Sequence, residues 1–248
     1  MNNYFISDIC KKIPDRFMAF GSIPLNNLTY AVDELHRVIH DLDMDGIVLG
    51  SNINQRSLSE DQFLPFFEET DRINVPLLLH PLRAIGEDLM PEEDRTLTVP
   101  PNVGFIFETT RTMAQMTFKG TFEEYGNLTF ILSHSGSAVP FIYPRWDIGY
   151  LARPDSHPIK RLPNPPSHYL KKHYYETAQS FSPSALRCTI ALAGLDHIFF
   201  GTDCPYANID FRATKTIENI EASGFSNEEK EKIYFKDATK LFPKILGR

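Results

Sequence analysis

Three short stretches of the sequence each end an apolar run with one ionisable side chain. They are "LLLHP" with His80, "FILSHSG" with His134 and "FFGTDCP" with Asp203. Neutral imidazole and carboxylate are the ligands that suit a catalytic divalent metal such as zinc, and the carboxyl ends of parallel strands in a barrel converge on one opening. The three residues therefore predict a metal pocket, provided that the runs are parallel strands.

Each of these residues also has a plainer explanation. His80 could be a hydrogen-bonded strand terminus, His134 a loop residue and Asp203 a cap on the turn that follows it. Three such endings in one chain favour the metal pocket, but the spacing alone does not establish that the side chains meet.

The apolar runs alternate with longer segments of helical period, which is the pattern of repeated β/α units around a parallel sheet. The runs predict strands at 16–24, 46–51, 75–81, 128–136 and 197–203, with a sixth candidate at 174–178. Helices are expected at 27–43, 59–74, 105–126, 182–194 and 226–246, the last opening with the capping-box spacing of Ser226 and Glu229. We interpret residues 1–248 as a single α/β domain.

Two stretches rich in proline and charge, 82–104 and 150–170, interrupt this alternation. Both follow predicted strands, so they are expected to be loops beside the site or simple surface insertions. His157, His168 and His173 lie in or near the second stretch, and we expect them on its surface. His36 and His40 stand four residues apart on a predicted helix, where a pair of histidines usually faces solvent, and we assign them no role in the site.

Composition excludes several classes of function. The 25 basic and 32 acidic residues give a formal charge of -7, and without a basic run a nucleic-acid partner has no electrostatic support. The three cysteines are far apart in the sequence, which argues for a reducing compartment and against a disulfide framework. The sequence shows neither a signal peptide nor an apolar stretch near the roughly 20 residues of a membrane span, so we expect a cytoplasmic protein without membrane contact.

A resemblance to a known family rests on a set of motifs in a fixed order. They include "RFMAFGSIPLNN", "LLLHP", "ILSHSGSAVPFIYPRWD", "YYETAQS" and "HIFFGTDCPYA". Over nearly its whole length the sequence resembles the amidohydrolase superfamily, in the branch of aminocarboxymuconate semialdehyde decarboxylase and the γ-resorcylate decarboxylases. The resemblance implies a (β/α)8 barrel of TIM type.

The resemblance also implies roles for individual residues. His80 and Asp203 correspond to metal ligands, with Asp203 also placed to take a proton, and His134 corresponds to a histidine that orients or deprotonates a water molecule. Arg145 in "YPRWD" corresponds to an arginine that reaches into a neighbouring subunit and holds a substrate carboxylate, which implies a homodimer. A surface salt bridge is the alternative for Arg145. The implied metal is zinc, with manganese as the second choice.

The sequence departs from the family at its start, where no counterpart of the first strand and its His-x-His or Glu-x-His pair is found. We therefore expect a barrel that is incomplete at the N-terminus, in which the metal site is weakened or lost. Three hypotheses follow: a metal-dependent hydrolase or non-oxidative decarboxylase of a small carboxylic acid, a catalytically impaired remnant, or an interaction module whose open sheet edges bind a partner.

Overall fold

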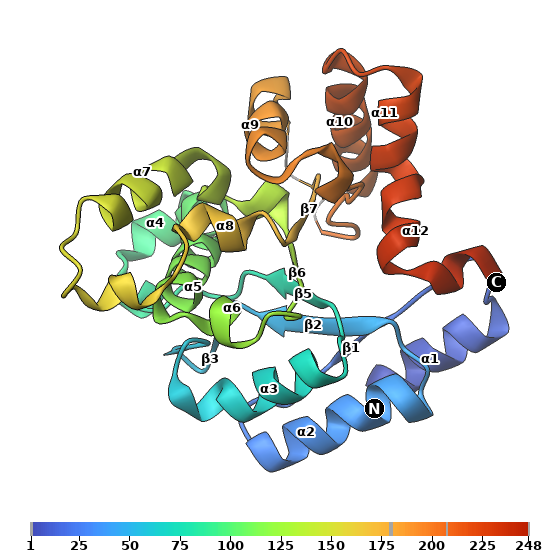
Figure 1. Ribbon diagram of the computed structural model, residues 1–248. Coiled ribbons are helices and arrows are strands. Elements are labelled where there is room, and N and C mark those ends of the chain that lie inside the picture. Colours follow the sequence, from blue (N-terminus) through green and yellow to red (C-terminus); the bar gives the residue numbers. More distant parts are fainter. Residues whose placement is uncertain (1, 179–180, 207, 248) are drawn as a thin grey trace. The chain divides into compact units, whose positions relative to one another are not determined.

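The apolar runs of the sequence form short strands (Figure 1). The chain divides into two units, and three of these strands pair in parallel in each unit. The computed structural model describes residues 2–178, 181–206 and 208–247. The first unit comprises Met1–Phe130 and Phe242–Arg248, and the second comprises Ile131–Leu241. Our interpretation of residues 1–248 as one domain stays a prediction.

All six predicted strands are confirmed, each shorter than the run that contains it. In the first unit the order is β1 (Phe20–Ser22), β2 (Gly46–Gly50), β5 (Leu77–His80), beside a small antiparallel pair, β3 (Asn52–Ile53) and β4 (Arg56–Ser57). In the second unit the order is β6 (Phe130–Leu132), which begins at the boundary, β7 (Tyr174–Glu176) and β8 (Ile198–Phe199).

Helices follow the strands in both units. Those of the first unit are α1 (Asn2–Lys12), α2 (Leu28–His36), α3 (Leu64–Arg72), α4 (Glu92–Thr96), α5 (Phe105–Lys119) and α6 (Thr121–Glu124). Those of the second unit are α7 (Val139–Leu151), α8 (Pro166–Leu170), α9 (Pro183–Ala193), α10 (Ile209–Ala222), α11 (Asn227–Glu231) and α12 (Asp237–Leu241). Among the described residues, every helix is too short or too polar to cross a lipid bilayer.

The five predicted helices are present, and the capping box of Ser226 and Glu229 is formed in both directions. The segment 105–126 is divided at Gly120, whose φ of +85° ends α5 in the left-handed region that glycine adopts without strain. Helices α1, α7 and α10 lie outside the predicted helices. The stretches expected as irregular loops, 82–104 and 150–170, contain the short helices α4 and α8, so that expectation was partly wrong.

Helix α2 shows why these segments are helical. Ala31, Leu35 and Val38 recur at intervals of four and three residues and are fully buried, so the helix and the turn after it present one apolar stripe to the core. A second part of the core of the first unit consists of aromatic rings, in which Phe67 and Phe122 both contact Phe130.

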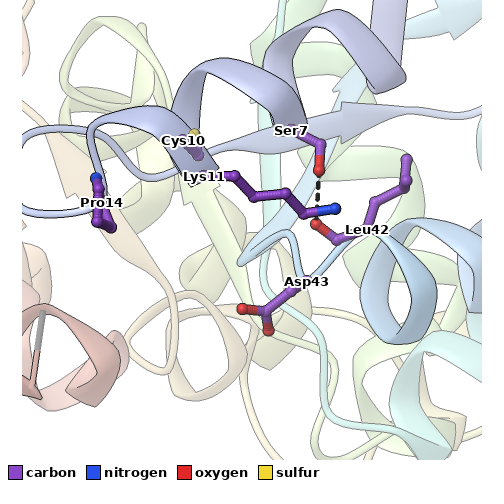
Figure 2. Close-up of a pocket in the computed structure, with 6 residues that line it drawn as sticks. All are labelled: Ser7, Cys10, Lys11, Pro14, Leu42 and Asp43. Atoms are coloured by element: carbon purple, nitrogen blue, oxygen red, sulfur yellow. Dashed lines mark hydrogen bonds between the residues drawn. The ribbon is translucent and has the colours of Figure 1, made fainter.

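Helix α1 covers the open edge of β1 through one side chain. The Asn3 amide donates to the Ser22 carbonyl oxygen at 2.9 Å and accepts from the Ser22 N–H at 2.9 Å, as a neighbouring strand would. One turn further on, Ser7 Oγ donates to the Leu42 carbonyl oxygen at 3.0 Å (Figure 2). Ser7 and Leu42 also line a pocket of about 120 Å³, together with Lys11 and Asp43. These three hydrogen bonds fix α1 to the rest of the first unit.

Replacing Asn3 should therefore cost stability. Asn3→Ala removes both bonds to Ser22, and we expect the free energy of unfolding to fall by roughly 1–2 kcal/mol, since one hydrogen bond contributes about 1 kcal/mol net. Urea unfolding followed by circular dichroism measures the change. Asn227→Ala, at an exposed asparagine, is the control and should be near neutral. Equal stability of the two variants would show that α1 does not protect the strand edge.

Candidate active site

His134 lies on an unusual turn directly after β6. The strand residues Phe130, Ile131 and Leu132 are buried, and the chain then passes through His134, Ser135, Gly136 and Ser137 with φ values of +55°, +54°, +75° and +61°. Gly136 is required here, because a Cβ at this position would overlap the Tyr175 ring. Three left-handed non-glycine residues in one turn are the kind of backbone strain that is found at functional sites.

Asp203 lies at the corresponding place after β8. It too has a left-handed backbone, with φ of +59°, and its Oδ2 atom is 3.6 Å from His134 Nε2. Both side chains are largely shielded from solvent, with 6% and 16% of their surface exposed. The structure thus brings together the two residues predicted to be catalytic, within the second unit.

A third ionisable residue, Glu176, lies beside this pair and was not predicted. It is the last residue of β7, and its carboxylate accepts hydrogen bonds from the N–H groups of His134 and Ala178. Loss of water around the carboxylate raises the pKa of Glu176, the neighbouring His134 lowers this pKa, and Asp203 raises it further. The signal was present in the sequence, since "YYE" ends an apolar run with a carboxylate just as the other three strands end.

His80 belongs to the first unit, as the last residue of β5. Its Nδ1 atom is 3.0 Å from the Pro81 carbonyl oxygen. A carbonyl only accepts, so this bond requires a proton on Nδ1 and leaves Nε2 with its lone pair, the tautomer that suits a metal ligand.

A buried network fixes the loop that follows His80. The Ser51 N–H donates to the His80 carbonyl oxygen at 3.0 Å, and Ser51 Oγ accepts from the Leu82 N–H at 3.0 Å. Asn52 Nδ2 donates to the Arg83 carbonyl oxygen and to Glu108 Oε1, both at 2.9 Å. Ser51, directly after β2, and Asn52, at the start of β3, therefore hold the backbone of His80 and of the residues that follow it in place.

Arg145 lies on α7, where it is exposed. Phe141 and Ile148 lie four residues before and three after it, on the same helix face, and are 79% and 65% exposed. The structure therefore leaves Arg145 on the surface of the second unit, among apolar side chains.

The other histidines of the sequence lie elsewhere. His36 pairs with Glu69, at 2.6 Å between Nε2 and Oε1, and its ring stacks on His40. His168 is exposed, as expected. The prediction for His173 was wrong: it is 1% exposed, because the chain after α8 turns inward to begin β7. Cys10, Cys188 and Cys204, all among the described residues, are not joined by a disulfide.

Comparison with known proteins adds a family match. Residues 1–244 match the protein family described as "Amidohydrolase". A 2-amino-3-carboxymuconate-6-semialdehyde decarboxylase of Dictyostelium discoideum is 30% identical over 233 residues, which is 93% of this chain and 62% of the relative. A γ-resorcylate decarboxylase of Rhizobium sp. (strain MTP-10005) is 28% identical over 97% of this chain and 74% of the relative. The chain thus spans about three fifths to three quarters of the length of these relatives.

A solved structure with the same fold comes from Polaromonas sp. JS666. It is a dihydroxybenzoic acid decarboxylase with bound manganese and the inhibitor 2-nitroresorcinol. It superposes with a TM-score of 0.83 and 26% identity, covering 100% of this chain and 74% of that chain. The expectation of an α/β fold of amidohydrolase barrel type is confirmed by this likeness.

Because His173 is buried, the free energy of unfolding should depend on pH in a way that can be tested. Loss of water, together with the nearby His197 and Lys172, lowers the pKa of His173 from 6.5 to about 3 in the folded protein. Between these two pH values the unfolded chain binds a proton that the folded chain does not, so stability that is present above pH 6.5 is lost as the pH falls towards 3. We expect this one group to contribute a loss of about 1 kcal/mol per pH unit in that range.

The comparison is between wild type and His173→Phe, with urea unfolding at several pH values from 7 to 4. The variant should lose less stability on acidification than wild type, and the exposed control His168→Phe should behave like wild type. Parallel losses in all three proteins would contradict the buried neutral state of His173.

Proposed function

Because the chain belongs to the amidohydrolase family, we propose that it is a metal-dependent, non-oxidative decarboxylase that acts on a small aromatic carboxylic acid. The observation that carries the proposal is the His134–Asp203 pair, at 3.6 Å, on strained turns after two parallel strands. The names of the relatives support decarboxylation rather than hydrolysis.

His80 and Asp203 are the metal ligands in this proposal. The donor set fits, because neutral imidazole and carboxylate both bind zinc and manganese, and the Pro81 carbonyl leaves His80 Nε2 with its lone pair. A bound divalent metal would supply positive charge that holds and polarises the oxygen atoms of an acidic substrate. Manganese in the Polaromonas relative makes it a candidate beside zinc.

The reaction needs one proton and releases one molecule of carbon dioxide. The ring carbon that bears the carboxylate accepts the proton, using a pair of ring electrons; the carbon–carbon bond to the carboxylate then breaks, and its electrons restore the aromatic ring. Asp203 and His134 are the groups that we assign to hold and deliver this proton, since a carboxyl and an imidazole in proximity can exchange one. Shielding from solvent keeps competing water away from the pair.

Arg145 is assigned to the substrate carboxylate of a neighbouring subunit in a homodimer. Its planar guanidinium suits a carboxylate, and its exposure on α7 leaves it available to a second copy of the chain. The exposed Phe141 and Ile148 on the same face would be covered by that copy. We also infer a cytoplasmic location, because the three cysteines form no disulfide among the described residues.

Loss of the Asp203 carboxylate should abolish both metal binding and turnover. We expect about one equivalent of zinc or manganese per chain in the wild type and a clear loss in Asp203→Asn. Decarboxylation of 2,6-dihydroxybenzoate and related acids, followed by mass spectrometry, should fall more than about 100-fold in kcat/KM. Asp210→Asn, at an exposed residue, is the matched control.

Three outcomes would contradict the proposal in different ways. Metal at background level in the wild type would favour a catalytically impaired remnant. Bound metal with hydrolysis of amide or ester substrates, and without release of carbon dioxide, would replace the decarboxylase by a hydrolase. Full activity in Asp203→Asn would remove that residue from the site.

A further inference from the structure

Glu176 ends the middle one of the three parallel strands in the second unit. In the register of these strands Tyr175 is opposite both Leu132 and Ile198, and Glu176 is opposite Phe199. The strand on one side leads into the turn of His134, and the strand on the other leads to Asp203. A side chain at the end of β7 is therefore placed between the two segments that carry the pair.

Both oxygens of the Glu176 carboxylate are engaged by backbone N–H groups. Oε1 accepts from the His134 N–H at 2.5 Å, and Oε2 accepts from the Ala178 N–H at 2.5 Å. Each oxygen therefore satisfies one buried backbone donor. The carboxylate thus binds the main chain of His134 and leaves the imidazole to face Asp203.

The conformation of His134 explains why such an anchor is needed. Its φ of +55° is in a region that L-residues seldom adopt, and such strained residues persist only where their surroundings hold them. The hydrogen bond to Glu176 is donated by His134, the first left-handed residue of the turn. A second bond, from Thr189 Oγ1 to the Ser135 carbonyl oxygen at 3.2 Å, supports the next residue.

The segment before Asp203 also packs against this carboxylate. A Cβ at Gly201 would overlap Glu176 Oε2, so only glycine allows the approach. The Gly201 backbone is held at this distance by Thr177 Oγ1, which accepts from its N–H at 3.1 Å and donates to its carbonyl oxygen at 3.2 Å. The position of Asp203, two residues later, depends on the same contact.

We propose that Glu176 is a positioning residue, which sets the relative placement of His134 and Asp203 by binding the backbone of one segment and packing against the backbone of the other. This inference rests on the proposed function in so far as the pair is the proton-transfer site. Glu176 itself does not contact the substrate in this role.

The first experiment uses Glu176→Gln, which keeps the volume and removes the charge. An amide nitrogen cannot accept a hydrogen bond, so one of the two N–H groups loses its acceptor. After sequential assignment, the ¹H–¹⁵N spectrum of ¹⁵N-histidine-labelled protein shows the backbone amides of the eight histidines. We expect the His134 amide to be strongly downfield and slow to exchange in the wild type, and to move upfield in Glu176→Gln, while the amides of the first unit stay in place.

The second readout is turnover of the metal-loaded enzyme. Glu176→Gln should lower kcat by about 10–100-fold, the range for groups that orient metal-site residues, with KM within about threefold. Glu176→Asp keeps the charge and should lie between wild type and Glu176→Gln. Glu218→Gln, an exposed glutamate of α10, is the matched control and should leave both the spectrum of His134 and kcat unchanged.

The amide spectrum and the turnover measurement together distinguish a failure of the positioning role from a failure of the proposed function. An unchanged chemical shift of the His134 amide in Glu176→Gln would overturn the positioning role. A changed chemical shift with an unchanged kcat would overturn it as well. If Glu176→Gln does not fold, the wild-type spectrum decides alone, because an ordinary chemical shift and fast exchange for the His134 amide would refute the bond. If the wild type lacks decarboxylase activity, the proposed function fails, and the amide shift still tests the contact.

Discussion

The hydrogen bond between the Glu176 carboxylate and the His134 N–H determines the geometry of the second unit at the ends of its strands. The bond joins the end of β7 to a turn in which four successive residues have positive φ. Without an acceptor at this place, the turn would relax to ordinary backbone conformations, because left-handed L-residues carry an energetic cost. The strain and the carboxylate are therefore parts of one arrangement that aims an imidazole at Asp203.

In the first unit, different interactions hold His80, the residue at the end of β5. His80 is fixed by its neighbouring carbonyl, and the buried side chains of Ser51, Asn52 and Glu108 hold the loop that follows. His80 ends a regular strand, whereas His134 lies on a strained turn. In both units the strands are short. The hydrogen bonds that position the functional side chains come mainly from the residue after the strand or from the adjacent strand.

Much of this architecture could be predicted from the sequence, and the exceptions have physical causes. His80, His134 and Asp203 were found because each ends an apolar run, and the six strands followed from the same runs. Glu176 was overlooked although it obeys the same rule, since the predicted run 174–178 extends two residues beyond it, whereas the strand ends at Glu176. Helix α7 was not predicted. It contains Pro140 and Pro144, but Pro140 lies in the first turn, where its missing N–H costs nothing. His173 was misplaced because proline-rich sequence does not reveal where a chain turns back into the core.

The metal assignment depends most directly on His80, whose bond to the Pro81 carbonyl places the ring proton on Nδ1 and the lone pair on Nε2. Pulsed electron paramagnetic resonance on the manganese-loaded protein detects such a nitrogen through its ¹⁴N hyperfine coupling. We expect this coupling in the wild type and in the control His40→Gln, and its loss in His80→Gln. An identical coupling in His80→Gln, or none in the wild type, would contradict a metal centre built on the strand-end residues of this chain.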